Sequence, residues 1–305
     1  MRTYLECIPC FLKQALEAAR KTGADEALCK KILDEVVLSV PGFGLESSPP
    51  EMARVIHGIV KRHTGVEDPY KDAKRQSNDL ALAIFDKLEN KVRNSGDELL
   101  AAVELAIAGN IIDYGVKNSL DVDAEIEKIL NLEHQAFERE KAGFFDHVSF
   151  RKVLGEAGTV LYLADNAGET VFDRILIEAI KRQDPGKLIT YAVKDKPIIN
   201  DALAEDAVVC GIDRSARVVS SGSDAPGTIL PLCSEEFRDI FKQADMVISK
   251  GQGNFETLSP ADRPVFFLFM AKCPVVAAHA GCEVGDILLL YEKERDPNYG
   301  SAMRT

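Results

Sequence analysis

The chain has 305 residues and a formal net charge of −12, from 37 Lys and Arg against 49 Asp and Glu. This length allows about two domains of typical size, with a large buried core. The acidic balance, with no basic stripe to offset it, argues against nucleic acid as a partner. No window holds ~18 consecutive apolar residues, so we expect no transmembrane helix and no membrane partner. The first residues lack the apolar run of a signal peptide, which predicts a cytoplasmic location.

Residues 1–150 predict a helical domain. Apolar residues recur at helical spacing in five segments, at 11–19, 27–37, 52–60, 80–88 and 99–107. Prolines and glycines interrupt the pattern between the segments. A further helix is expected at 124–141, and residues 142–145 would lead into the second domain.

Cys7 and Cys10 stand three residues apart at the beginning of this helical half. A thioredoxin-like redox pair would need a βαβ setting, which the helical pattern does not offer. A structural zinc site would need two further ligands, and none of the other cysteines or the histidines is paired at short spacing. The third interpretation is structural packing at a helix start, with Pro9 in the first turn. The pair is thus a structural element or a second metal site, and we expect no tightly bound thiophilic metal.

Residues 151–305 predict a Rossmann-like α/β/α sandwich with a largely parallel sheet. Short apolar runs alternate with helical stretches and end in polar or glycine-containing turns, at 159–163, 188–193, 217–219 and 246–249. The carboxyl ends of parallel strands meet at one edge of a sheet, which is where open α/β folds bind their ligands. The polar residues of these turns are therefore expected to converge.

The run at 159–163 leads into Asp165 and Asn166, and a helical pattern follows Gly168. Carboxylate and amide oxygens suit Mg²⁺ or Mn²⁺, and the helix N-terminus behind them favours an anion. A metal beside an anion site suggests phosphate chemistry. The alternative is that both residues only cap the helix. Asp201, which follows a bend at Pro197, is either a third oxygen ligand or an ordinary acid at a helix start.

The run at 246–249 ends in Lys250-Gly-Gln-Gly-Asn254, which matches neither the dinucleotide-binding nor the Walker spacing of glycines. Its glycines still allow a close backbone approach to an anion, with Lys250 supplying positive charge. The alternative is a solvated lysine before a flexible turn. In the helical half, Asn110 and Asp113 would share a helix face, unless the helix ends at Gly109 and Asn110.

In order along the chain, seven blocks resemble the metal-dependent damage-control phosphatases of the DUF89 family, particularly the archaeal type with an N-terminal Cys-x-x-Cys. The resemblance covers most of the chain. The blocks are Cys7-Ile-Pro-Cys10, Asp68-Pro-Tyr70 with Lys74, Gly109-Asn110-Ile-Ile-Asp113, Asp165-Asn166-Ala-Gly-Glu169, Asn200-Asp201-Ala202, Gly222-Ser-Asp-Ala-Pro-Gly227 and Lys250-Gly-Gln-Gly-Asn-Phe-Glu256.

The resemblance implies that a catalytic divalent metal is bound by Asp165, Asn166 and Asp201. Mn²⁺ is the expected ion, with Ni²⁺, Co²⁺ and Mg²⁺ as alternatives. The phosphate pocket would be lined by Asn110, Asp113, Glu169 and Lys250, and the further residues expected to bind substrate are Gly168, Ser223 and Asn254. Lys250 would stabilise charge in the transition state, and Glu169 would orient the attacking water or accept its proton.

The expected function is metal-dependent hydrolysis of a small phosphate ester, such as a damaged or surplus nucleotide or sugar phosphate. Direct attack by water and a covalent phospho-intermediate on an Asp both fit the sequence. One alternative is an S-adenosylmethionine-dependent carboxyl methyltransferase, although residues 165–168 are a poor version of its glycine-rich turn. The other is a non-enzymatic metal- or nucleotide-binding module. The sequence carries no indication of oligomeric state.

Overall fold

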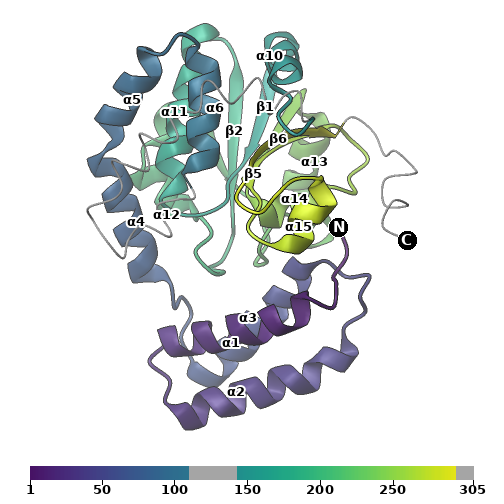
Figure 1. Cartoon of the computed structure of the whole chain (residues 1–305). Coiled ribbons are helices and arrows are strands. Elements are labelled where there is room, and N and C mark those ends of the chain that lie inside the picture. The colour runs from purple at the N-terminus through teal and green to yellow at the C-terminus, as the bar shows by residue number, and fades with distance from the viewer. Residues whose placement is uncertain (110–142, 293–305) are drawn as a thin grey trace.

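The computed structural model describes residues 1–109 and 143–292. Its centre is a six-stranded sheet with the order β3-β2-β1-β4-β5-β6 (Figure 1). The strands are β1 (Thr159–Leu163), β2 (Leu188–Val193), β3 (Arg217–Ser220), β4 (Met246–Lys250), β5 (Val265–Met270) and β6 (Ile287–Glu292). The first five strands run parallel, and β6 pairs antiparallel with β5. The predicted sandwich with a largely parallel sheet is therefore confirmed.

Helices surround this sheet and form a separate group near the N-terminus. They are α1 (Cys7–Lys21), α2 (Glu26–Ser39), α3 (Pro49–Thr64), α4 (Lys71–Ala83), α5 (Phe85–Arg93), α6 (Glu98–Ala108), α10 (His147–Glu156), α11 (Glu169–Gln183), α12 (Ala204–Val209), α13 (Glu235–Gln243), α14 (Gln252–Leu258) and α15 (Pro274–Ala280). The five predicted helical segments lie in α1–α6, and the segment at 80–88 spans two helices. The helix predicted at 124–141 lies outside the described residues.

Local chemistry explains where several of these helices begin. The Asp25 side chain accepts a hydrogen bond from Leu28 N at the start of α2, and Ser48 and Glu51 form a capping box at α3. Both arrangements satisfy backbone N–H groups that the first helical turn leaves unpaired. None of the described helices has the length and apolar character needed to span a bilayer.

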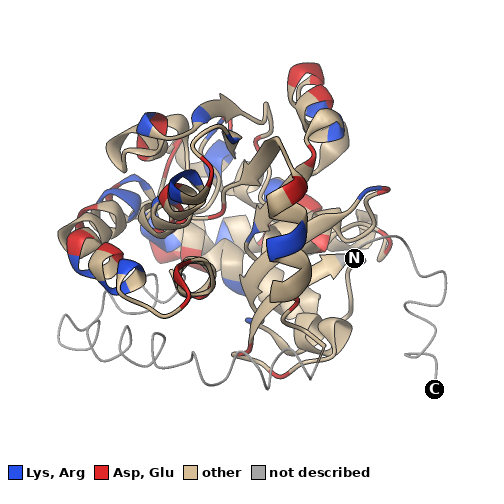
Figure 2. Ribbon diagram, turned by 90° about the horizontal axis from the view of Figure 1, so that it is seen from above, with Lys and Arg blue, Asp and Glu red and all other residues tan. Residues whose placement is uncertain are grey.

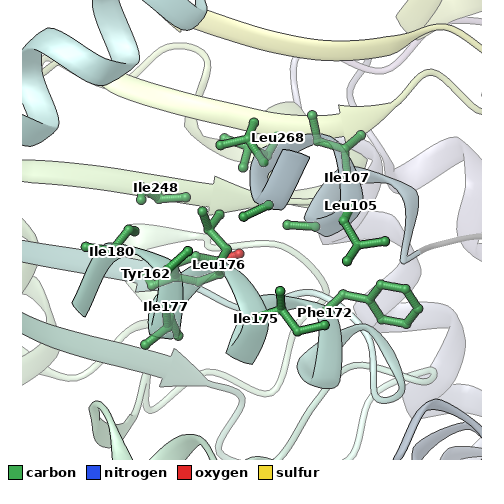
Figure 3. Packing of buried hydrophobic residues seen from close by; sticks show 14 of the residues in the cluster. Leu105, Ile107, Tyr162, Phe172, Ile175, Leu176, Ile177, Ile180, Ile248 and Leu268 are labelled. Atoms are coloured by element: carbon green, nitrogen blue, oxygen red, sulfur yellow. The ribbon is translucent and has the colours of Figure 1, made fainter. Parts of the chain in front are cut away.

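The sheet buries both of its faces. On one face, alternate strand residues such as Tyr162, Ile248 and Leu268 pack against α6 and α11 (Figure 3). On the other face, residues such as Val247 and Phe267 pack against α13, α14 and α15. This alternation follows from the two-residue period of a strand.

The helices of the N-terminal half belong to two different cores. Helices α1–α3 enclose their own apolar cluster, whereas α4, α5 and α6 contribute to the cluster of the sheet. The predicted division into domains at 1–150 and 151–305 stays a prediction, because the core of the sheet extends across it. What matters for the site is that α3 lies at the end of the molecule where the parallel strands finish (Figure 1).

Candidate functional site

The candidate site lies at the point where the strand order changes direction. Strand β1 is flanked by β2 on one side and β4 on the other. Asp165 follows β1, and Lys250 is the last residue of β4. Open α/β sheets bind ligands in the crevice at such a switch point, outside the carboxyl ends of the strands.

The structure brings the three predicted metal ligands together. Asn166 and Asp201 form an isolated antiparallel bridge, Ala202 N donates to Asp165 O at 2.8 Å, and Ala167 N donates to Asn200 O at 2.9 Å. Backbone pairing thus fixes the turn after β1 against a segment more than thirty residues later in the chain.

The two alternatives that the sequence left open for these residues do not describe the structure. Gly168 is the N-cap of α11, and no side chain caps that helix, so capping does not account for Asp165 and Asn166. Asp201 precedes α12, which begins at Ala204, and pairs with Asn166 instead of opening a helix.

Two unusual backbone positions hold this arrangement. Ile199 has φ 46°, which is strained for a β-branched residue and costs on the order of 1–3 kcal/mol. Gly251, after β4, has φ 81°, and a Cβ there would lie 2.0 Å from Asp165 Oδ2. The Asp165 carboxylate therefore occupies space that only a glycine at position 251 leaves free.

The site is buried and rich in negative charge. Asp165, Asn166 and Asp201 are 9%, 6% and 4% exposed. Burial raises the pKa of Asp165 well above its ordinary value, and the neighbouring Glu169 and Asp201 add to the shift. Burial also raises the pKa of Asp201 to about 6, although Lys194 acts in the opposite direction. Desolvation and like charge both disfavour the ionised carboxylates, which a bound cation would stabilise.

The donor set fits a divalent cation. Asp201 Oδ2 is buried and accepts no hydrogen bond from the described residues, with Lys194 Nζ at 3.6 Å. Asn166 Nδ2 donates to Asp165 Oδ2 at 3.0 Å and to Glu169 Oε1 at 2.8 Å, so its Oδ1 remains as an acceptor. Within 1–109 and 143–292, no three His, Cys, Asp or Glu side chains form a metal cluster. The candidate set is therefore two carboxylates and an amide, a hard-oxygen set suited to Mg²⁺ or Mn²⁺.

Lys250 is fully buried and lies between two acids. Its Nζ donates to Asp173 Oδ1 at 2.7 Å and to Glu169 Oε2 at 3.2 Å. Although burial opposes its charge, the Asp173 and Glu169 carboxylates raise the pKa of Lys250. The alternative of a solvated lysine therefore does not describe the structure. The role of Lys250 at a phosphate stays a prediction. The structure shows Lys250 as the counter-ion of two buried carboxylates.

Asp173 is the centre of this buried network. Its Oδ1 accepts from Tyr162 OH at 2.7 Å and its Oδ2 from Tyr191 OH at 2.8 Å. Both tyrosines lie on the central strands β1 and β2 and stack with their ring centroids 5.4 Å apart. A continuous chain of hydrogen bonds thus runs from the core of the sheet through Asp173, Lys250, Glu169 and Asn166 to Asp165.

Three residues expected to bind substrate have protein partners. Gly168 N donates to Asn78 Oδ1 at 2.7 Å. Ser223 Oγ accepts from Ala225 N at 3.2 Å. Asn254 Nδ2 donates to Ala164 O and Lys250 O at 3.0 and 2.7 Å. They shape the turns around the site, and their contact with substrate stays a prediction.

The remaining predicted residues lie elsewhere. Asn110 and Asp113 lie outside the described residues. Cys7 is partly buried and Cys10 exposed in the first turn of α1, and both are free thiols. Burial raises the pKa of both thiols, and the neighbouring Cys273 adds to the shift. This setting does not favour the reactive thiolate form.

Sequence reasoning did not identify three residues of the site. Asp173 is fully buried on α11, and its signal was an acid on the apolar face of that helix. Lys194 is buried at the end of β2 and donates to Gly227 O. Asn78 on α4 contacts both Gly168 N and Asp206 Oδ1. Gly227 lies 33 residues from Lys194, and the partners of Asn78 lie 90 or more residues away, so spacing alone could not show these contacts.

Comparisons of the chain with family models, known sequences and solved structures all indicate the same family. Residues 3–288 match the damage-control phosphatase ARMT1-like domain. A damage-control phosphatase of Archaeoglobus fulgidus is 34% identical, covering 92% of this chain and 96% of that protein. Another, from Pyrococcus horikoshii, is 32% identical, covering 96% of this chain and 99% of that protein. The crystal structure of a DUF89 family protein from P. horikoshii superposes on this chain with a TM-score of 0.86 at 31% identity. The match covers 96% of this chain and 100% of that one. The chain belongs to the ARMT1-like (DUF89) family of damage-control phosphatases.

Proposed function

We propose that the protein is a phosphatase that acts on damaged metabolites and depends on a divalent metal, with Mn²⁺ as the expected ion. Family membership supports phosphatase activity. The observation that carries metal dependence is the pair of buried acids at the switch point, whose like charges the lysines of the described residues do not fully offset. The proposal also includes a small phosphorylated metabolite as the substrate and a cytoplasmic location for the protein.

In this proposal Asp165, Asn166 and Asp201 hold the ion. The bound ion supplies charge neutralisation for phosphoryl oxygens and lowers the pKa of bound water. The three residues are preorganised for this role, because backbone pairing fixes the relative position of their two segments. Such preorganisation spares the enzyme reorientation during the reaction.

In this proposal Glu169 and Lys250 act by positioning the metal ligands. Glu169 accepts from Asn166 at one oxygen and from Lys250 at the other. This contact fixes the Asn166 amide with its nitrogen toward the acids and its oxygen available for the ion. Partners that orient metal ligands in this way typically change affinity or activity ~10–100-fold when removed. Acceptance of a proton from water by Glu169 stays a prediction beside this orienting role.

The proposal is tested by thermal unfolding and by turnover, each with and without added Mn²⁺. We expect Mn²⁺ to raise the Tm, since a ligand that binds only the folded state stabilises it by mass action. We also expect Mn²⁺ to produce hydrolysis of p-nitrophenyl phosphate. Absence of both effects with Mn²⁺, Ni²⁺, Co²⁺ and Mg²⁺ would contradict metal dependence. A Tm increase with S-adenosylmethionine in metal-free protein would favour the methyltransferase alternative.

A further inference from the structure

A buried group of polar residues lies between the candidate metal site and the core of the sheet. Asp173, on α11, and the side chains of Tyr162 and Tyr191 that contact it are all 0% exposed. Tyr162 OH and Lys250 Nζ both donate to Asp173 Oδ1, each at 2.7 Å, and Tyr191 OH donates to Asp173 Oδ2 at 2.8 Å. We call Tyr162, Tyr191 and Asp173 the tyrosine–aspartate anchor.

The stability of the fold does not account for the anchor. Its residues lie among apolar side chains of the sheet core, such as Ile175 and Leu176 (Figure 3). Taking charged groups out of water is costly, and replacing a buried ion pair by apolar residues of similar volume is often neutral or stabilising. Apolar residues could therefore fill this part of the core without loss of stability, and the polar contacts point to a role at the neighbouring site.

The anchor holds Lys250 by its charged end. The Lys250 ammonium group has two carboxylate partners, and Asp173 is the nearer, at 2.7 Å compared with 3.2 Å for Glu169. The Asp173 carboxylate is itself held by one tyrosine hydroxyl group on each of its oxygens. A lysine side chain is a flexible four-carbon stem with a point charge at its end. These contacts give that charge a fixed position.

The fixed ammonium group in turn determines where the Glu169 carboxylate lies. Glu169 Oε2 accepts from Lys250 Nζ, and Glu169 Oε1 accepts from Asn166 Nδ2 at 2.8 Å. An amide side chain has one nitrogen donor and one oxygen acceptor, so a partner that holds the nitrogen also sets the direction of the oxygen. The Asn166 oxygen, a proposed metal ligand, is thus placed by contacts that begin at the two tyrosines.

We propose that the tyrosine–aspartate anchor positions the metal ligands. The anchor holds Lys250 against Glu169, and Glu169 directs the Asn166 amide oxygen toward the cation. This inference rests on the proposed metal-dependent function and concerns the affinity of that site for its ion. Residues that orient metal ligands typically change metal affinity or activity ~10–100-fold when they are removed.

Asp173→Asn tests the anchor with little change of shape. The amide oxygen still accepts a hydrogen bond from a tyrosine, whereas the neutral side chain no longer attracts the Lys250 ammonium group. Lys250 then keeps only Glu169 of its two carboxylate partners. The Glu169 carboxylate is therefore free to move with Lys250 and away from Asn166.

A second variant and two controls separate positioning from stability. Tyr162→Phe with Tyr191→Phe removes both hydroxyl groups and leaves the carboxylate charge in place. Tyr291→Phe is the matched control, because Tyr291 pairs with Phe266 at the start of β5, the end of the sheet away from the site. Val92→Ala is the control for stability, because it shortens a fully buried side chain on α5, a helix that contributes no residue to the described site.

The experiment titrates Mn²⁺ into each protein by electron paramagnetic resonance, which distinguishes free from bound Mn²⁺ without turnover. Near-ultraviolet circular dichroism shows whether each variant is folded. We expect Asp173→Asn to raise the dissociation constant for Mn²⁺ at least tenfold, and the tyrosine double variant to raise it at least threefold. Tyr291→Phe and Val92→Ala should stay within twofold of wild type, although Val92→Ala lowers the Tm.

The positioning role is overturned if folded Asp173→Asn and the tyrosine double variant bind Mn²⁺ as wild type does and only their Tm falls. An equal loss of affinity in Val92→Ala would also overturn it, because lower stability would then explain the effect. Failure of the proposed function gives a different result. In that case wild type binds no Mn²⁺, or Asp165→Asn binds it as tightly as wild type.

Discussion

Asp165 is held where its own charge is disfavoured, and in our proposal this links stability to metal binding. Its carboxylate is buried next to Glu169 and Asp201, and burial is the largest cause of its raised pKa. In the metal-free protein near neutral pH, the folded state must either protonate Asp165 or bury its charge. Both carry a free-energy cost that the unfolded state avoids.

Asp165→Asn should therefore separate stability from function. The neutral amide removes the buried charge and keeps an acceptor for Asn166, so we expect a higher Tm than wild type in chelator at pH 7.5. We also expect loss of the Tm increase with Mn²⁺ and of hydrolysis. Asp239→Asn, at an exposed position on α13, is the control and should leave all three unchanged. An unchanged response of Asp165→Asn to Mn²⁺ would remove Asp165 from the ligand set.

Lys250→Met should destabilise the fold as well as reduce turnover. The variant keeps the aliphatic stem but leaves Asp173 and Glu169 buried without their shared counter-ion. Removing one partner of a buried ion pair typically costs ~3–5 kcal/mol. Urea denaturation of Lys250→Met, with the exposed Lys242→Met as control, measures this cost.

A second variant shows whether the cost arises from the unpaired acid. Adding Asp173→Asn to Lys250→Met removes the uncompensated charge, so the free energy of unfolding should partly recover. Equal or greater loss in the double variant would show that Lys250 does not act as the counter-ion of Asp173.

Among the elements, the turn from β4 into α14 places the most demanding constraint on the site. Gly251 and Gly23 have φ 81° and 80°, so alanine is strained at both positions. At Gly251, ψ 157° places the backbone in a region that is essentially restricted to glycine. At Gly23 nothing lies within 4 Å of an added Cβ, whereas at Gly251 the Asp165 carboxylate lies 2.0 Å away. Gly23→Ala is therefore a control for an alanine at positive φ away from the site.

Gly251→Ala should lose the Mn²⁺-dependent rise in Tm, because its methyl group displaces a proposed metal ligand. Gly23→Ala should lower the Tm modestly and keep the full response. The measurement is thermal unfolding of both variants across a Mn²⁺ titration. Equal responses in the two variants would mean that the close approach of Gly251 has no functional importance.

The same elements show what the sequence could predict. The runs that became β1–β4 were visible because each ends in polar residues, and parallel pairing brings those ends to one edge. Asp165 and Asn166 were predicted at that edge for this reason, whereas Asp201 was placed beside them by the family resemblance, and the structure pairs Asn166 with Asp201. Strands β5 and β6 were not predicted: β5 is a continuous apolar run that leads into Ala271, without a polar turn to mark its end.

The contacts of Asp173 and Lys194 depend on information that local patterns lack. Asp173 reads as a misplaced acid on an apolar helix face until Tyr162, Tyr191 and Lys250 converge on it. Those partners come from three different strands, so only the assembled sheet defines the network. Residue types and strand ends were therefore predictable, whereas the pairing among them required the tertiary structure.

At the scale of the whole molecule, the site depends on contacts between the helical half and the sheet. Asn78 on α4 joins Gly168 and Asp206, and Arg54 on α3 pairs with Asp224. Lys and Arg are interspersed with Asp and Glu along the described helices (Figure 2). The net charge of −12 therefore does not exclude anions from a site that has its own lysines. Local positive charge, not the total, decides whether phosphate can approach.

Glu256 makes part of the stability of the fold depend on pH. Its backbone carbonyl accepts from the Met1 amino group at 2.6 Å, and its side chain accepts from Gln252 Nε2 at 2.9 Å. Burial raises the pKa of Glu256 from 4.5 to about 7. Between these values the folded state keeps the proton that the unfolded state has released. This contribution is thus fully present below pH 4.5 and is lost as the pH rises to 7.

Glu256→Gln should remove this pH dependence, because the amide imitates the protonated acid and does not ionise. At ~1.4 kcal/mol per pKa unit, the shift corresponds to about 3 kcal/mol. The stability of the variant relative to wild type should therefore increase by about that amount between pH 4.5 and pH 8. Urea denaturation of both proteins in chelator at several pH values measures the difference, and groups such as His57 that titrate equally in both cancel. A difference that does not vary with pH would show that Glu256 is ionised in the folded protein throughout this range.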